Sequence, residues 1–295
     1  MKVLVTGVAG QLGFDVMNEL LKRGHEAIGS DLKADYETNF TYVPMDITDE
    51  AMVKDVIRKV QPEAIVHCAA WTAVDAAEEE ENKDKVYKIN SLGTKYIAQA
   101  TKEIDAKMIY ISTDYVFNGQ GETPWTPDCK EYEPLNYYGK TKLDGELAVS
   151  NLLEKYYIVR IAWVFGKNGN NFIKTMLSVG KKFDTLRVVN DQIGTPTYTY
   201  DLARLLIDMV EKDKYGYYHA TNEGGYISWY DFACEIFKQA NYDTKVIPVT
   251  TEEYGLSKAA RPENSRLDKS KLVENGFESL PSWKNALNRY LKEVQ

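Results

Sequence analysis

The chain contains 295 residues, of which 44% are hydrophobic, and its formal net charge at pH 7 is -8. This length allows a sizeable core, in one large domain or in two unequal ones. The acidic balance argues against a general nucleic-acid or membrane-surface binder, so any anionic ligand must be held by a local site.

Cysteines and histidines are few. The three cysteines are too scattered for a disulfide framework, and the three histidines have no metal-ligand spacing. No apolar run approaches the length of a membrane span, and the N-terminus lacks a secretory apolar segment. We therefore expect a cytoplasmic, enzyme-sized protein without a membrane or nucleic-acid partner.

The first residues predict a strand that is joined to a helix by a glycine loop. Apolar residues 3–5 are typical of a buried parallel strand, and apolar positions recur at helical spacing from 12 to 21. Gly7, Gly10 and Gly13 would leave the first helix amides open to a pyrophosphate, because no Cβ blocks the approach. A purely structural turn is the alternative interpretation.

A second strand over residues 26–30 ends in Asp31, about the offset at which a carboxylate binds a ribose hydroxyl. This context favours a dinucleotide fingerprint over a structural turn. Asp31 favours NAD over NADP because its charge would repel a 2′-phosphate, whereas nearby Lys33 would weaken that preference. Use of both cofactors therefore stays open.

Strands and helices alternate through residue 165. Further strands are expected at residues 41–44, 64–70, 108–112 and 157–163, and helices at 49–60, around 86–97 and from about 136. This alternation predicts an α/β fold, a Rossmann-type doubly wound parallel sheet with ligands at the carboxyl ends of its strands. Asp46 and Ile47 are candidates for contact with adenine, and a helix N-cap is the equally supported alternative.

The alternation loosens after residue 165. We expect a dinucleotide-binding domain at 1–165 and a smaller, discontinuous substrate lobe at 166–295, with part of 186–220 returning to the sheet. Elements are expected there as helices at 172–179, 201–210 and 229–239 and strands at 186–189, 217–220 and 245–249. The active site would then lie between the two parts.

Tyr138 and Lys142 stand four residues apart, which places a phenol and an ammonium on one face of the expected helix. A free phenol has a pKa of about 10, and an adjacent cation favours its phenolate form, so the pair suits proton transfer near neutrality. The preceding strand ends near Thr113, whose hydroxyl could share a carbonyl oxygen with Tyr138. A surface packing role for the pair is the alternative.

Several motifs resemble those of the extended short-chain dehydrogenase/reductase family, namely Gly7-x-x-Gly10-x-x-Gly13, Asn90, Ser112-Thr113-Asp114 and Tyr138-x-x-x-Lys142. Residues 69–75, 112–117, 190–197 and 261–268 more closely resemble the dTDP-4-dehydrorhamnose reductases within that family. The likeness covers essentially the whole chain, and the last three of these segments are the more discriminating.

The resemblance implies reduction of the 4-keto group of dTDP-4-dehydro-L-rhamnose by a nicotinamide cofactor. Thr113 would hydrogen-bond the ketone, Tyr138 would donate the proton to the developing alkoxide, and Lys142 would lower the Tyr138 pKa and hold the nicotinamide ribose. The implied cofactor-binding residues are Gly7, Gly10, Gln11, Leu12, Gly13, Asp31, Asp46, Ile47, Ala69, Ala70, Asn90, Tyr138 and Lys142. The implied substrate-binding residues are Trp71, Val74, Asp75, Thr113, Asp114, Trp163, Asn190, Gln192, Pro196 and Arg261.

Some of these residues carry further expectations. Asn90 would support a helix or water relay behind Lys142, and Arg261 would meet the substrate diphosphate because a planar guanidinium suits that group. Trp163 is equally readable as a core aromatic. Trp71 stands where relatives often have a smaller or imidazole side chain, so the sugar pocket could be reshaped. Some family members need magnesium at a dimer interface, so a magnesium requirement and a monomer or homodimer both stay open.

Two alternatives remain. A nucleotide-sugar epimerase or dehydratase could use the same scaffold, although a dehydratase would commonly show Asp-Glu after the threonine, and here Tyr115 follows Asp114. A non-catalytic relative that binds NAD(P), like the regulatory subunit of methionine adenosyltransferase, is the other. The joint presence of Thr113, Tyr138 and Lys142 argues against it.

Overall fold

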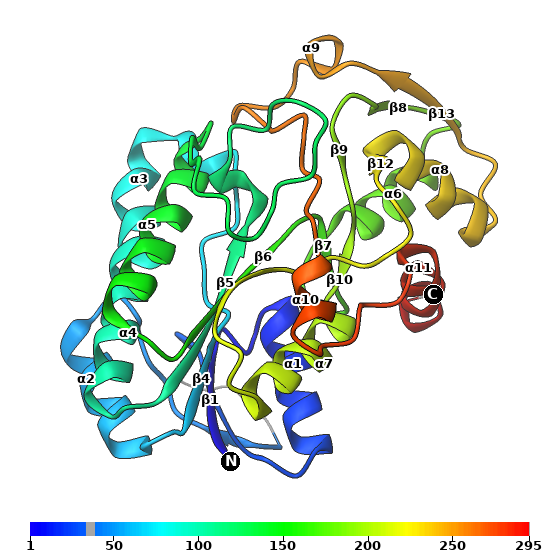
Figure 1. The fold of residues 1–295 in the computed structure, drawn as a ribbon. Helices are drawn as coiled ribbons and strands as arrows, with labels where there is room; N and C mark the ends of the chain where they lie inside the picture. Colours follow the sequence, from blue (N-terminus) through cyan, green and yellow to red (C-terminus); the bar gives the residue numbers. More distant parts are fainter. Residues whose placement is uncertain (34–38, 295) are drawn as a thin grey trace.

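The computed structural model describes residues 1–33 and 39–294. Within them, seven strands form the central sheet, namely β1 Lys2–Thr6, β2 Glu26–Ser30, β3 Thr41–Tyr42, β4 Ala64–His67, β5 Lys107–Thr113, β6 Tyr156–Ile161 and β11 Gly216–His219. Their order is β11-β6-β5-β4-β1-β2-β3, and every pairing is parallel (Figure 1). The predicted doubly wound sheet is confirmed. The order in which strands are added to the sheet reverses between β1 and β4, which is the point where ligands of such sheets bind.

Helices cover both faces of the sheet because each buried strand presents alternate residues to opposite sides. On one face, Val3 and Val5 pack against α1 (Gln11–Lys22) and α7 (Thr199–Glu211). On the other, Leu4 packs against α2 (Glu50–Val60) and α4 (Thr94–Glu103), beside α5 (Tyr137–Leu152). The elements predicted up to residue 163 therefore all exist, with ends that shift by a few residues.

The helix expected around 86–97 is more complex than its apolar spacing predicts. A 3₁₀ turn, Ala76–Glu78, is followed by α3 (Glu80–Tyr87), a π-helical turn over Lys88–Gly93, and then α4. A π turn inserts one residue into the helical repeat and is often found at functional sites. Here it carries Asn90, which the sequence singles out.

The smaller lobe is built on aromatic packing between three helices, α6 (Phe172–Gly180), α8 (Trp229–Ala240) and α11 (Trp283–Val294). Beside them, β8 (Thr185–Val189) pairs in parallel with β13 (Lys245–Val249). The remaining elements are β7 Val164–Phe165 paired with β10 Thr197–Tyr198, β9 Ile193–Gly194 paired with β12 Ile227–Ser228, the 3₁₀ turn Asp114–Val116, α9 Thr251–Tyr254 and α10 Ser270–Glu274. None of these shorter elements was predicted, nor was α11.

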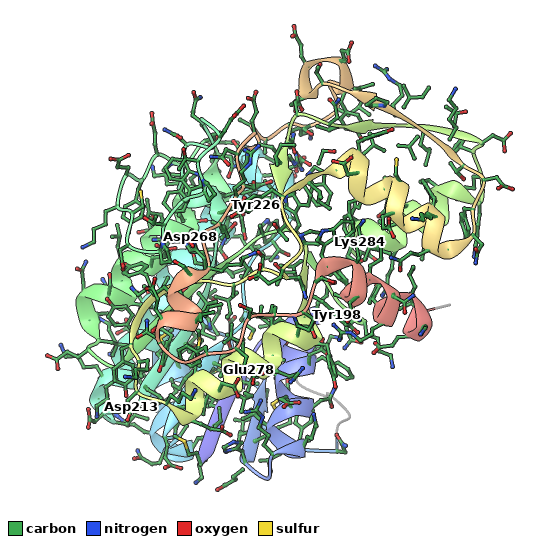
Figure 2. All side chains as sticks on the ribbon, turned by 45° about the vertical axis from the view of Figure 1, so that its right-hand side comes forward. Tyr198, Asp213, Tyr226, Asp268, Glu278 and Lys284 are labelled. Atoms are coloured by element: carbon green, nitrogen blue, oxygen red, sulfur yellow. The ribbon has the colours of Figure 1, made fainter. Side chains whose placement is uncertain are left out.

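The chain passes between the two parts more than once. After β10 it returns to the sheet as α7 and β11, and after β13 it returns again as α10, which packs beside β11. The labelled side chains of Asp268, Glu278 and Lys284 mark this last crossing toward α11 (Figure 2). No helix within the described residues is both long and apolar enough to cross a membrane. The predicted boundary at residue 165 stays a prediction.

Candidate active site

The glycine loop after β1 has no room for side chains. Gly7 has a φ of 72°, which favours glycine, and a Cβ there would lie 2.7 Å from the Ala69 nitrogen. A Cβ on Gly13 would collide with the Gly7 carbonyl, so only glycine lets α1 start this close to the loop. The N-cap Gly10 offers no side-chain cap, and the first turn of α1 holds no acidic residue. These open amides and the positive helix end fit a pyrophosphate.

Two clefts border this loop, and a third adjoins the second of them. The outer cleft, about 500 Å³, opens over the ends of β1, β2 and β4, and the central cleft, about 430 Å³, lies beside β5 and α5. Gly7, Gly10, Cys68 and Ala70 line both, so the two are continuous. The distal cleft, about 330 Å³, lies in the smaller lobe and shares Trp229 with the central one.

The outer cleft brings together most of the residues proposed to hold adenosine. Asp31, Asp46, Ile47, Ala69 and Ala70 all line it. The Asp31 carboxylate accepts hydrogen bonds from the backbone nitrogens of Ala9 (3.0 Å) and Leu32 (2.8 Å), which fixes it at the rim. The N-cap alternative for Asp46 is wrong, because Asp49 caps α2, whereas Asp46 accepts from Thr48 in its own turn.

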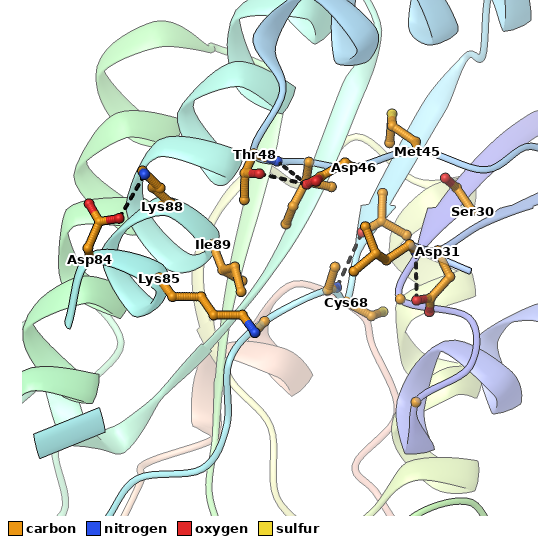
Figure 3. Close-up of a pocket in the computed structure, with 17 residues that line it drawn as sticks. Ser30, Asp31, Met45, Asp46, Thr48, Cys68, Asp84, Lys85, Lys88 and Ile89 are labelled. Carbon is orange, nitrogen blue, oxygen red and sulfur yellow. Dashed lines mark hydrogen bonds and ion pairs between the residues drawn. The ribbon is translucent and has the colours of Figure 1, made fainter. Parts of the chain in front are cut away.

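Lysines also line the outer cleft, which the sequence did not indicate. The Lys85 side chain extends from α3 into the cleft, while Lys88 pairs with Asp84 at 2.7 Å (Figure 3). The Lys85 ammonium lies 5.4 Å from the centre of the Trp71 ring, a cation–π contact. Trp71, predicted to bind substrate, lines none of the three clefts and instead supports this lysine.

The central cleft holds Thr113, Tyr138 and Lys142 together. Thr113 is the last residue of β5. Asn136 is the N-cap of α5, and its side-chain oxygen accepts a hydrogen bond from the Gly139 nitrogen at 2.8 Å. This cap sets Tyr138 and Lys142 on the first turns of α5, facing the end of β5. Lys142 is 3% exposed, and its Nζ donates to the Ile111 carbonyl at 2.7 Å.

Burial governs the titration of the central cleft. It raises the pKa of Tyr138, an effect that the charge of Asp114 increases and a hydrogen bond with Thr113 opposes. Burial lowers the pKa of Lys142 to about 7 against the opposing charge of Glu146. Asp114 is buried too, and its pKa rises to about 6 despite hydrogen bonds with Ser265 and Thr113. Lys142 is not among the influences on Tyr138, so its predicted effect on the phenol stays a prediction.

Asn90 lies behind this cleft rather than in it. Its side chain is fully buried, accepts from the Trp71 nitrogen at 2.8 Å, and donates to the Trp71 carbonyl and the Thr141 hydroxyl, each at 3.2 Å. It thereby ties the loop after β4 to α5 next to Lys142. Asn90 lines none of the three clefts, so the arrangement suits the predicted supporting role.

The loop glutamine connects the two parts of the molecule. Gln11 lines the central cleft with Leu12, and its side-chain oxygen accepts from the Gly166 nitrogen at 2.9 Å and from Asn171 at 3.1 Å. Both partners belong to the segment that enters the smaller lobe. The start of α1 is therefore anchored to that lobe by a side chain that also faces the cleft.

Two tryptophans stand where the central and distal clefts meet. Trp163 and Trp229 stack with ring centroids 3.8 Å apart at an interplanar angle of 17°. Trp163 has a φ of 50°, uncommon for a bulky residue, and Gly194 packs beneath it, since a Cβ there would lie 3.0 Å from the indole. Trp163 is half-buried, lines the central cleft and also packs against a core cluster that includes Phe117, so its role in substrate binding stays a prediction. Trp229 was missed, because nothing in the sequence indicates which lobe residue it meets.

The distal cleft gathers Asp75, Gln192 and Arg261. The Arg261 guanidinium makes a bidentate pair with Asp75, at 3.0 and 2.8 Å, which lowers the pKa of Asp75 to about 2. Val74 and Asp114 line the central cleft instead. Asn190 is exposed and Pro196 is buried, and neither lines any of the three clefts. Among the described residues, no cluster of three His, Cys, Asp or Glu side chains could hold a metal ion.

The whole chain is similar to proteins of one known family. The family model described as the RmlD substrate binding domain matches residues 1–295. The spore coat polysaccharide biosynthesis protein SpsK of Bacillus subtilis is 40% identical over 99% of this chain and 97% of its own. The dTDP-4-dehydrorhamnose reductase of Aggregatibacter actinomycetemcomitans is 38% identical over 97% of each.

Solved structures give the same likeness in three dimensions. A dTDP-4-dehydrorhamnose reductase from Clostridium acetobutylicum superimposes with a TM-score of 0.92 at 42% identity and covers all of both chains. The corresponding reductase from Bacillus anthracis, solved in complex with NADP, has a TM-score of 0.90 at 39% identity and covers 100% of this chain and 99% of its own.

Proposed function

The chain belongs to the RmlD substrate binding domain family, and from this membership we propose that it reduces dTDP-4-dehydro-L-rhamnose to dTDP-L-rhamnose with NADH or NADPH. The observation that carries the proposal is that the glycine loop, Thr113, Tyr138 and Lys142 line one cleft. A product of this kind would serve cell-surface polysaccharide synthesis in the cytoplasm. The name of the relative from A. actinomycetemcomitans supports the substrate.

The outer and central clefts would hold the extended cofactor. The open amides of α1 would bind its pyrophosphate, Asp31 an adenosine ribose hydroxyl, and Asp46 and Ile47 the adenine edge. When bound, the reduced nicotinamide supplies the hydride that reduces the carbonyl carbon. Asp31 favours NADH because a 2′-phosphate beside it would be repelled, although the B. anthracis relative was solved with NADP.

The chain's own residues would manage the proton. The Thr113 hydroxyl, which donates to Asp114 at 3.0 Å, would turn to hydrogen-bond the ketone oxygen. Tyr138 would donate its phenolic proton to that oxygen as it gains negative charge. Burial favours this direction, since a raised pKa keeps the phenol protonated before the reaction. The Lys142 ammonium would hold the nicotinamide ribose and stabilise the remaining phenolate.

The nucleotide part of the substrate would extend into the distal cleft. The stacked rings of Trp163 and Trp229 would form one wall of the sugar pocket and direct the sugar toward Tyr138. The guanidinium N–H groups of Arg261 that do not bind Asp75 would donate to the diphosphate, and Gln192, which lines the same cleft, would contact the nucleoside. The Asp75 pair would thus hold the guanidinium at a fixed angle before substrate arrives.

Turnover can be followed by the loss of reduced-nicotinamide absorbance when the protein meets dTDP-4-dehydro-L-rhamnose, with NADH or NADPH and with or without magnesium. We expect turnover by the unsubstituted chain and its loss in Tyr138→Phe, which keeps cofactor binding. Tyr137→Phe is the matched control, because Tyr137 precedes Tyr138 on α5 but lines none of the three clefts. Unchanged turnover in Tyr138→Phe would refute the mechanism.

A further inference from the structure

A network of buried hydrogen bonds lies beside the outer cleft and includes a histidine that has no role in the proposed mechanism. Thr6 ends β1 and His67 ends β4, side by side in the sheet register. The Thr6 hydroxyl lies 2.7 Å from His67 Nδ1, and His67 Nε2 lies 3.1 Å from the Thr94 hydroxyl at the start of α4. Each of these three side chains is about 1% exposed.

The donor and the acceptor of each hydrogen bond in this network can be deduced. Thr94 donates to the Asn90 carbonyl at 2.7 Å, which can only accept, so the Thr94 oxygen accepts from His67 Nε2–H. His67 Nδ1 must then accept from the Thr6 hydroxyl, whose oxygen in turn accepts from the Ala69 nitrogen at 3.3 Å. This needs a neutral imidazole, and burial together with the Lys142 charge lowers the pKa of His67 to about 3.

Both ends of this hydrogen-bond network reach the same loop, residues 69–71. One end is the Ala69 backbone, and the other is Asn90, whose side chain holds the backbone of Trp71. The backbone of residues 69–71 is therefore held at each end by a hydrogen bond to a buried side chain, of Thr6 at one end and of Asn90 at the other. Ala69 and Ala70 line the outer cleft, and each contributes only a methyl group to packing, which for Ala69 is against the core beside β4.

We propose that His67 and Thr94 are positioning residues, which fix the loop 69–71 in the shape that binds the dinucleotide. The inference rests on the proposed function, because it takes the outer cleft as a cofactor site. Thr6 lines the outer cleft, whereas His67 and Thr94 line none of the three clefts. They act through the loop backbone and, through Asn90 and Thr141, on the helix that carries Lys142.

Thr94→Val tests the inference, because valine keeps the shape of threonine and removes the hydrogen bonds that the hydroxyl makes with His67 and the Asn90 carbonyl. Thr101→Val is the matched control, because Thr101 is buried in the same helix but is not part of the hydrogen-bond network. Like Thr94, its hydroxyl donates to the carbonyl of the residue four positions earlier, here Ile97 at 2.7 Å. Thr94→Ser restores the hydroxyl. Binding of NADH and NADPH is measured by nicotinamide fluorescence, alongside kcat, KM and thermal unfolding.

We expect Thr94→Val to weaken cofactor binding roughly tenfold and to raise the cofactor KM more than it lowers kcat, with Thr94→Ser within about twofold of the unsubstituted chain. Thr101→Val should lower the melting temperature comparably without changing cofactor affinity. Thr6→Val combined with Thr94→Val should weaken cofactor binding no more than the stronger of the two single substitutions, because either one interrupts the hydrogen-bond network.

Two outcomes would overturn the inference while the proposed function stands. One is equal cofactor affinity in Thr94→Val and Thr101→Val, and the other is a failure of Thr94→Ser to restore affinity. If the unsubstituted chain and Thr101→Val both fail to bind either nicotinamide cofactor, the proposed function itself fails, and this inference with it.

Discussion

Replacing Glu146 by Gln should destabilise the protein strongly, because Glu146 and Arg160 form an ion pair in which both side chains are fully buried. The Arg160 Nε and Nη2 atoms each donate to one carboxylate oxygen at 2.8 Å. An amide keeps one acceptor and turns its NH2 group toward the other guanidinium N–H. The variant therefore leaves a buried cation without its counter-charge.

Breaking a buried pair on one side costs about 3–5 kcal/mol. At about 2–4 °C per kcal/mol for a chain of this size, the melting temperature should fall by roughly 10 °C. Chemical denaturation and thermal unfolding measured by circular dichroism check the two values. Since the Glu146 charge also raises the Lys142 pKa against burial, the variant should move the Lys142 titration to lower pH.

Two comparisons make this result specific. Asp55→Asn breaks the Lys59–Asp55 pair, whose side chains are 75% and 60% exposed, and should change the unfolding free energy by less than about 0.5 kcal/mol. Glu146→Leu combined with Arg160→Met should recover most of the loss, because the pair is then replaced by apolar volume. A loss below about 1 kcal/mol in Glu146→Gln would refute the reasoning.

Two further predictions concern cofactor choice and pH. Asp31→Ala should raise the ratio of kcat/KM for NADPH to that for NADH about tenfold, because it removes the charge that would repel a 2′-phosphate; an unchanged ratio, measured with both cofactors on one preparation, would show that Asp31 does not set the choice. For Lys142, the folded pKa is about 7 and the ordinary value is 10.5, so the unfolded chain binds more protons between these pH values. The unfolding free energy of the cofactor-free protein should therefore rise from pH 7 to pH 9, and this rise should shrink in Lys142→Met, as denaturant titrations at each pH will test.

The large elements could be predicted from the sequence because their signals are local. Residues 3–5 read as a strand since a sheet covered on both faces makes its strands continuously apolar, and β2 was placed at Glu26–Ser30 as the structure has it. The proximity of Tyr138 to Thr113 could be predicted because the helix that carries Tyr138 follows the strand that ends at Thr113, and ligands bind at that end of the sheet. The two-residue strands of the smaller lobe have no period that could reveal them.

The rest of the site depends on contacts between distant segments. The stack of Trp163 on Trp229 joins residues 66 positions apart, and the pairing of Arg261 with Asp75 joins residues 186 positions apart. No spacing along the chain indicates either contact. The sequence predicts that Arg261 meets the substrate diphosphate, but it gives no sign of the carboxylate of Asp75 that pairs with this guanidinium. The α11 helix had a usable signal in its buried positions Ala286, Leu287, Tyr290 and Leu291.

Because the chain crosses repeatedly between the two parts, they can complete their folding only in a certain order during synthesis. Once residue 219 has left the ribosome, every strand of the seven-stranded sheet is available for pairing. The aromatic core of the smaller lobe still lacks Trp283, Leu287 and Tyr290, which arrive with α11. The nascent chain can thus form its sheet well before the smaller lobe has a complete core, and the distal cleft, whose lining includes Arg261, is completed late in translation.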